Sequence, residues 1–231
     1  MRYVSLGDSS GVGIGADSGG GYPHRLAKRL RDHGVDVQHT NLAESGAQAK
    51  DVLRNQVQAC ARLKPDLVTV GIGGNDLWQL VPVATFQQQL QQIVDALAID
   101  DVDVVFLNIV DLSLAPIAAM AERYVQVTRE QIVGRVESLN AVMADVVHRA
   151  NAAALAARRN SNFVVVDVCS ASRAEIIGHP EFFAGDGFHP SARGYERFTE
   201  LLWPVVSFAL QRRGRLASER LRGVPDKERS L

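Results

Sequence analysis

The feature that most constrains the fold is a regular alternation of short β-rich apolar runs with longer stretches of helical periodicity. Such alternation is typical of a parallel sheet with helices on both faces, because each strand returns to the same edge through a crossover helix. The near-continuous Val, Ile and Leu content of the runs indicates strands buried on both faces. We therefore expect an α/β fold, a three-layer α/β/α sandwich around about five parallel strands. The predicted strands cover residues 2–6, 35–40, 66–72, 102–110 and 163–168.

Helical stretches separate and follow these strands. The fourth exceeds about 25 residues, which predicts a break near its start. Gly34 and Gly214 follow the first and last stretches as helix stops. Pro204 predicts a kink inside the last stretch, because proline removes a backbone donor and clashes with the preceding turn. The predicted helices cover residues 22–33, 47–63, 85–98, 124–159 and 190–213.

Composition restricts the class of protein. Of the 231 residues, 46% are apolar and 22% are charged, and the formal net charge is −1. These values exclude disordered and disulfide-rich secreted proteins and argue against a nucleic-acid partner. The two cysteines, Cys60 and Cys169, form no metal-binding or redox motif, so we expect reduced structural thiols.

A cytoplasmic location is the expectation from the ends and the hydropathy of the chain. The first predicted strand begins at Arg2 and leaves no room for a secretory leader, and no run of about 18 apolar residues exists for stable membrane insertion. We expect one domain over residues 1–213. Residues 214–231 are expected to form a basic, poorly ordered tail, since the chain from Arg212 onward carries seven basic and three acidic residues. The sequence leaves the oligomeric state open.

Two segments at opposite ends of the sequence carry candidate reactive side chains. Ser9 follows the first strand within Gly-Asp-Ser-Ser-Gly, at the carboxyl edge where parallel sheets place their sites. Taken alone, a turn or N-cap serine explains such a segment better. Asp186 and His189 lie three residues apart before the last helix, so the carboxylate can orient the imidazole while its other nitrogen faces Ser9. Pro190 at the first helical position would place His189 at the helix N-cap.

Two further loops carry candidate donors for a developing negative charge. Asn75 follows the third strand in a glycine-rich loop, and an asparagine amide is a neutral donor suited to an oxyanion. Gly46 follows the second strand and can offer its backbone N–H at the start of a helix. Each of the two is weak alone, since Asn-Asp after glycines is also common in turns.

Together the four segments resemble the SGNH hydrolases, the GDSL-type esterase and lipase family, from Arg2 to about Arg213. Gly7-Asp8-Ser9-Ser10 is similar to the family's first block, with serine in place of the usual leucine at position 10. The resemblance implies that Ser9 is the nucleophile, that Asp186 and His189 complete a catalytic triad, and that Ser9, Gly46 and Asn75 form the oxyanion hole. It also implies a flavodoxin-like sheet, a small-molecule ester substrate, and no cofactor or metal. Thioester hydrolysis and acyl transfer by the same triad remain alternatives.

Competing motifs overlap the same residues. The segment around Ser9 also fits the nucleophile elbow of α/β-hydrolases, but that elbow follows a central strand preceded by several others. Gly11, Gly13 and Ala16 satisfy a dinucleotide-binding fingerprint, so an NAD-binding protein is the rival from another class. The fingerprint requires a helix that begins within the motif, and the three glycines at residues 19–21 delay it. A binding protein with a decayed hydrolase site is a further alternative. The presence of all five matching residues argues against it.

The other candidate side chains are assigned less specific roles. His179 also precedes a proline, but no acid stands three residues before it, so we expect a loop histidine. Asp8, Asp76 and Asp167 are expected to brace loops at the same sheet edge. Three phenylalanines flank the Asp186–His189 loop and are candidates for an acyl pocket, or equally for a lid over the core: Phe182, Phe183 and Phe188.

Overall fold

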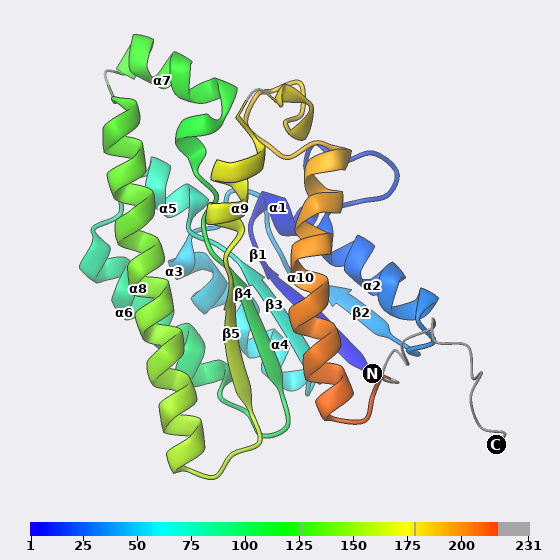
Figure 1. The fold of residues 1–231 in the computed structure, drawn as a ribbon. Coiled ribbons are helices and arrows are strands. Elements are labelled where there is room, and N and C mark those ends of the chain that lie inside the picture. Colours follow the sequence, from blue (N-terminus) through cyan, green and yellow to red (C-terminus); the bar gives the residue numbers. More distant parts are fainter. Residues whose placement is uncertain (126, 178, 217–231) are drawn as a thin grey trace, which may run out of the picture.

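The computed structural model describes residues 1–125, 127–177 and 179–216, and within them five strands form one parallel sheet (Figure 1). The strand order is β2-β1-β3-β4-β5, so the first strand of the chain lies inside the sheet between the second and the third. This is the doubly wound topology that the alternating sequence predicts. The strands are β1 (Arg2–Gly7), β2 (Gln38–Asn41), β3 (Leu67–Gly71), β4 (Asp103–Leu107) and β5 (Asn162–Val166).

Burial separates the central strands from the edge. Every residue of β3 and β4 is buried, as the apolar runs predict. The expectation of a buried strand over residues 35–40 is wrong, because β2 begins only at Gln38 and its four residues are exposed or half-buried. Val35 and Val37 are buried just before it, where they pack with the helices on one face of the sheet. The apolar residues of this run therefore fill the core ahead of a polar edge strand.

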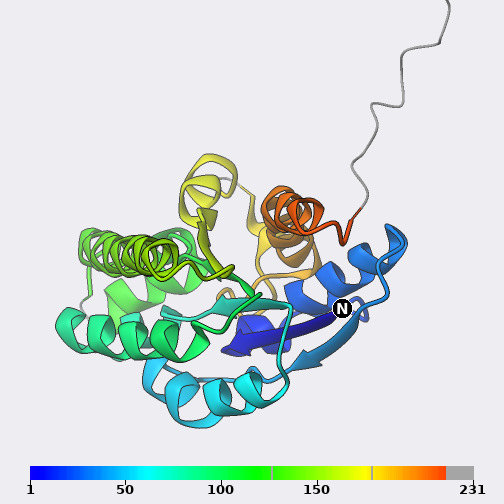
Figure 2. The same cartoon turned by 90° about the horizontal axis from the view of Figure 1, so that it is seen from below.

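Helices cover both faces of the sheet (Figure 2). One face packs against α2 (Tyr22–Asp32) and α10 (Ala192–Arg212), which contact each other. The other face carries α6 (Val83–Leu97), α8 (Arg129–Ala156) and a segment of α3 (Ala49–Asp51), a π-helical turn η1 (Val52–Gln56) and α4 (Val57–Arg62). The predicted break in the long helical stretch is confirmed, since α7 (Pro116–Val125) ends before α8 begins. Thr128 and Gln131 form a capping box at that start.

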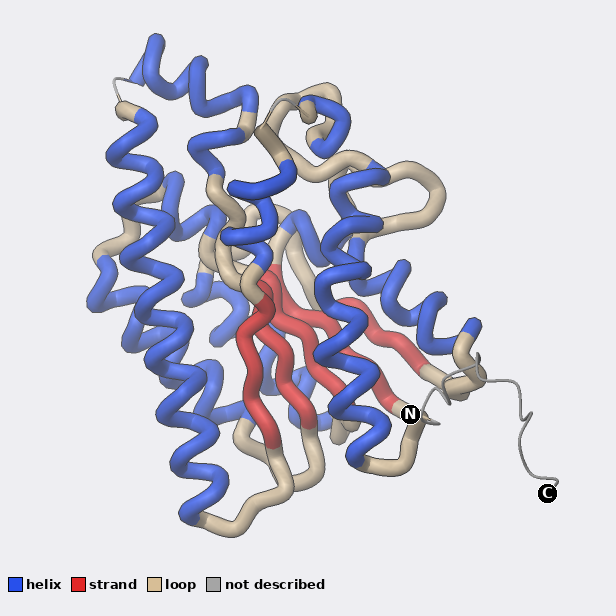
Figure 3. The backbone as a smooth tube through the Cα atoms, viewed as in Figure 1, coloured by secondary structure: helices blue, strands red, loops and turns tan. Residues whose placement is uncertain are grey.

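Short helices and loops gather at the carboxyl edge of the strands (Figure 3). A parallel sheet brings all of its carboxyl ends to one edge, so residues far apart in the sequence meet there. The elements at this edge besides α7 are α1 (Ser9–Val12), α5 (Gly74–Trp78), α9 (Val168–Glu175) and two 3₁₀ turns, η2 (Leu112–Leu114) and η3 (Pro180–Phe182).

The end of α10 is fastened to the opposite, amino edge of the sheet. Arg213 forms an ion pair with the fully buried Asp103 of β4, and Arg215 pairs with Asp66 at 3.1 Å. Leu216 is buried against the same core as α2. Arg215 and Leu216 thus pack on the domain, contrary to the expectation for residues 214–231. The rest of that predicted tail, residues 217–231, lies outside the described residues.

Both cysteines lie in the interior of the protein. Cys60 and Cys169 are free and buried, as expected for structural thiols. No helix in the described part of the chain combines the length and the apolar character needed to cross a membrane.

Candidate active site

The nucleophile candidate Ser9 is presented by a tight turn at the end of β1. Gly7 adopts a φ of +139°, and a Cβ at this position would lie 2.1 Å from the Gly71 carbonyl oxygen of β3. Only glycine fits here, because the backbones of β1 and β3 approach closely while the chain turns. The side chain of Gln56 holds the Gly7 N–H and C=O at 2.8 and 2.9 Å. Asp8 then caps α1, so Ser9 is the first residue of a short helix.

Ser9, His189 and Asp186 form a continuous chain of hydrogen bonds. The Ser9 Oγ lies 2.9 Å from His189 Nε2, and His189 Nδ1 lies 2.6 Å from Asp186 Oδ2. A carboxylate only accepts hydrogen bonds, so Nδ1 carries the proton and Nε2 is free to accept from the serine hydroxyl. The structure therefore brings together the three side chains that the sequence singles out from its two ends. This arrangement can deprotonate the serine as it attacks an electrophile.

Asp186 is held in its ionised form. Burial alone would raise its pKa, but hydrogen bonds from the His189 ring and from the backbone N–H groups of Phe188 and His189 lower the pKa of Asp186 to about 2. Those N–H groups donate to Oδ1 at 2.9 and 3.0 Å, which leaves Oδ2 for the imidazole. The backbone of its own loop therefore orients the Asp186 carboxylate independently of the imidazole.

The predicted position of His189 at a helix N-cap is wrong. The helix α10 begins at Ala192, and Ser191 caps it by accepting from the Gly194 N–H at 3.3 Å. Pro190 instead pairs with Phe183 in an isolated antiparallel bridge, and the Ala184 N–H donates to the His189 carbonyl oxygen at 2.8 Å. A serine hydroxyl also caps a helix better than an imidazole does. The imidazole is therefore oriented by Asp186 and by this bridge rather than by a helix terminus.

The loops after β2 and β3 are joined to each other and to the end of β1. Asn75 donates from Nδ2 to the Ala47 carbonyl at 3.0 Å, which fixes its side-chain amide beside the loop that contains Gly46. The Gly46 loop is itself joined to β1, since the Glu44 N–H donates to the Gly7 carbonyl at 3.0 Å. An amide nitrogen carries two protons, so one remains for a ligand after the bond to Ala47.

Two buried carboxylates brace these loops, as the sequence predicts. Asp8 accepts from the N–H and Oγ of Ser10 at 2.9 and 2.8 Å, and burial raises its pKa. Asp76 accepts from the Ala49 N–H at 3.1 and 3.2 Å, and burial raises the pKa of Asp76 to about 6. On the far side of the Asn75 loop, Arg135 of α8 donates to the carbonyls of Asp76, Leu77 and Val81.

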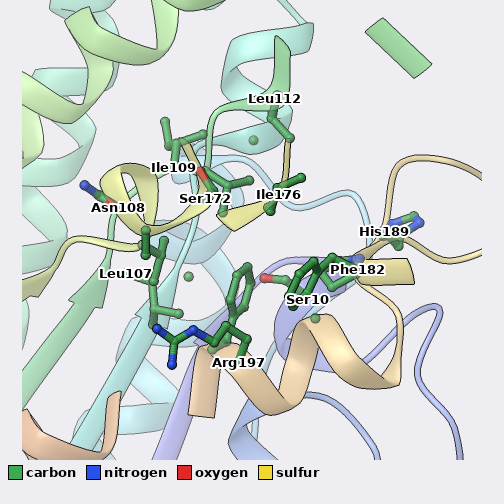
Figure 4. A pocket seen from close by; sticks show the side chains of 18 of the residues that line it. Ser10, Leu107, Asn108, Ile109, Leu112, Ser172, Ile176, Phe182, His189 and Arg197 are labelled. Carbon is green, nitrogen blue, oxygen red and sulfur yellow. The ribbon is translucent and has the colours of Figure 1, made fainter. Parts of the chain in front are cut away.

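A largely apolar pocket of about 120 Å³ opens beside Ser9 and His189 (Figure 4). It lies between the end of β4, α9 and α10, and Phe182, Phe183 and Phe188 line it, so the candidate phenylalanines surround a cavity. Its polar lining residues include Ser10, which points into the pocket, and Arg197 of α10. Its apolar lining also includes Leu107, Val168 and Leu201.

Sequence reasoning missed the α9 side of this pocket. The eight residues of α9 are too few to establish a helical period, and Ser172, Glu175 and Ile176 line the cavity only because the helix folds over β4. The sequence signal for the start of α9 is Asp167, an N-cap residue that accepts from the Ser170 N–H and Oγ.

The competing motifs have other roles. His179 bonds Glu181 at 2.9 Å on an exposed loop, as expected. Gly11 and Gly13 lie in and directly after α1, and α2 begins only at Tyr22. A dinucleotide fingerprint needs its long helix to start within the motif, so this segment lacks that geometry.

Comparison with known proteins places the chain in a family. A sequence model of the GDSL-like lipase/acylhydrolase family matches residues 5–197. The chain belongs to this family. The match contains every residue of the Ser9, Gly46, Asn75 and Asp186–His189 segments.

Individual relatives of this GDSL-like chain agree in sequence and fold. The esterase TesA of Pseudomonas aeruginosa is 30% identical over 109 residues, which are 47% of this chain and 54% of the relative, so the match spans about half the length of that protein. A crystal structure of TesA superposes with a TM-score of 0.69 at 23% identity and covers 91% of this chain and 100% of that one. A lipase/acylhydrolase from Enterococcus faecalis superposes with a TM-score of 0.66 at 23% identity, over 95% of this chain and 100% of the other.

Proposed function

We propose that this GDSL-like protein hydrolyses carboxylic esters of small molecules through an acyl-serine intermediate. The observation that carries the proposal is the hydrogen-bonded chain from Ser9 through His189 to Asp186 beside an apolar pocket. The name of the Pseudomonas aeruginosa relative, an esterase, supports the same reaction class.

The proposed reaction has two halves. The Ser9 Oγ attacks the ester carbonyl while its proton passes to His189 Nε2, and the carbonyl oxygen becomes an oxyanion. The imidazolium, stabilised by Asp186, then protonates the departing alcohol and leaves an acyl-serine. A water molecule attacks this acyl group, with His189 again taking the proton, and the collapse of the second oxyanion releases the acid and restores the serine hydroxyl.

The oxyanion is proposed to be held by three donors. They are the backbone N–H groups of Ser9 and Gly46 and the free amide proton of Asn75. The bond from Asn75 to Ala47 supports this role, because a donor that is already fixed needs no reorganisation when the charge develops.

The cellular compartment is a separate proposal. Cys60 and Cys169 are both buried free thiols, which fits a reducing compartment, and we propose that the enzyme acts in the cytoplasm. Cell fractionation followed by detection of the protein tests this location, and recovery in an extracellular fraction would contradict it.

A panel of nitrophenyl esters from acetate to palmitate, assayed beside NAD binding, tests the reaction class. We expect nitrophenol release by the wild type, loss of most turnover in Ser9→Ala, and normal turnover in Ser18→Ala, since Ser18 is an exposed loop serine. Nucleotide binding without ester turnover would replace the esterase by a dinucleotide-binding protein. Absence of turnover on every ester would favour a binding protein.

A further inference from the structure

One face of α10 forms a long side of the pocket. Gly194, Arg197, Phe198 and Leu201 all line the cavity, and their spacing of three and four residues places them on a single helix face. From Gly194, near His189, to Leu201 the helix rises about 10 Å. The apolar space beside Ser9 therefore extends along about two helical turns.

An ion pair crosses the pocket between α9 and α10. Arg197 of α10 donates from Nε and from a terminal nitrogen to the two carboxylate oxygens of Glu175 at 2.6 Å each. Its other terminal nitrogen donates to Glu200 at 2.7 Å. In Figure 4 the guanidinium reaches toward Leu107, on the side of the pocket away from His189. On α10, Arg197 lies about one turn after Gly194 and one turn before Leu201, so the bidentate pair lies between these two lining residues.

This ion pair presents the wrong chemistry for a hydrocarbon chain. Three of the five N–H donors of the guanidinium are directed at the two glutamates, and the charged groups offer no apolar surface to a hydrocarbon chain. A methylene group that reaches it gains no apolar burial, whereas each methylene placed against Phe182, Val168 or Leu201 contributes about 0.8 kcal/mol, which is about fourfold in kcat/KM.

We propose that the Glu175–Arg197 ion pair sets the upper limit of acyl-chain length. The inference rests on the proposed ester hydrolysis at Ser9. An acyl chain that runs along α10 from Gly194 toward Leu201 meets Arg197 on the way.

The test compares nitrophenyl esters from acetate to palmitate in the wild type and in the double variant Glu175→Gln/Arg197→Met. In the wild type, kcat/KM rises with chain length up to a limit and then stops rising. In the double variant the rise continues beyond that limit, and the ratio of kcat/KM for an ester four carbons longer to that for the ester at the limit increases about fifteenfold, the value of roughly two newly buried methylene groups.

A matched control is available on the same helix. Arg25→Met/Glu196→Gln removes an ion pair between α2 and α10 whose residues do not line the pocket, and this variant keeps the wild-type length profile. Arg197→Met alone serves if the double variant unfolds, because Glu175 is about one-third exposed and stays hydrated.

The outcomes separate the inference from the proposed function. If the wild type hydrolyses acetate but both proteins show the same length limit, or if the control moves the limit equally, the ion pair does not select chain length. If the wild type hydrolyses no ester, the proposed function itself fails. A longer acyl-chain limit in Glu175→Gln/Arg197→Met or in Arg197→Met, with no change in the control variant, supports the inference.

Discussion

The Asn75 side chain donates to the carbonyl oxygen of Ala47 at 3.0 Å, so a side chain from the loop after β3 is anchored on the loop after β2. A second connection runs beside it, from the Ala49 N–H to the Asp76 carboxylate. The two loops that carry Gly46 and Asn75 are therefore fixed to each other independently of any ligand. Fixed donors of this kind are the preorganisation that the proposed oxyanion site requires.

Replacement of Asn75 by alanine tests that role. We expect Asn75→Ala to lower kcat by about 100-fold to 1,000-fold with a small change in KM, because a donor to the oxyanion acts mainly in the transition state. Steady-state kinetics on a short soluble ester measure both constants. A change confined to KM would instead assign Asn75 to ground-state binding.

The three members of the proposed triad should act as one unit. Ser9→Ala, His189→Ala and Asp186→Asn are each expected to remove most of the turnover, while the Ser9→Ala/His189→Ala double variant loses little more than either single variant. His179→Ala is the matched control, since this exposed histidine bonds Glu181 by the same ring nitrogen that His189 uses for Asp186. Additive losses, or inactivation by His179→Ala, would show that the reacting groups are assigned wrongly.

Asp76 should make stability depend on pH. Its pKa is about 6 in the folded protein and 3.8 ordinarily, because burial disfavours the charge. Between these values the folded chain retains a proton that the unfolded chain has lost, so the free energy of unfolding falls as the pH rises from 4 to 6.

Denaturant unfolding at several pH values checks this prediction. The difference in unfolding free energy between the wild type and Asp76→Asn should decrease by at most about 3 kcal/mol from pH 4 to pH 7. The pKa of Asp8 is also raised by burial, but Asp8 is present in both proteins, so most of its contribution cancels in the difference. A difference that stays constant over this range would mean that the Asp76 pKa is not raised.

The ion pair at the amino edge of the sheet should be important for stability. Asp103 is fully buried and Arg213 is 7% exposed, so Arg213→Ala leaves a buried carboxylate without its main partner. We expect a loss of about 3–5 kcal/mol in unfolding free energy. In the exposed Arg149–Asp145 pair of α8, Arg149→Ala should cost less than about 1 kcal/mol. Equal effects of the two substitutions would contradict this interpretation.

The sequence predicts most of the sheet because its signals there are local. The apolar runs that become β3 and β4 are continuous, and burial on both faces explains that composition. Ser9, Asp186 and His189 could be paired in advance because strand ends in a parallel sheet share one edge. The sequence does not indicate the bounds of β2, because its residues, Gln38–Asn41, carry no apolar pattern.

The pocket depends on contacts that no local pattern encodes. Glu175 and Arg197 are 22 residues apart and belong to two helices, one of which is too short for its period to be recognised. Pro190 predicts a helix N-cap at His189 because proline is a common first helical residue, whereas the antiparallel bridge at Pro190 depends on Phe183. Such pairings follow from the tertiary fold alone.

The bond between Ser9 and His189 joins residues 180 positions apart, and this separation has a consequence in time. A ribosome adds about 5–20 residues per second, so Ser9 is synthesised roughly 10–35 s before His189. Because α10 follows the His189 loop and packs on the sheet, we expect a nascent chain to hold the two side chains together only once α10 has docked. Ester turnover would then appear late and abruptly during synthesis, and the premature chain would carry only an unactivated serine.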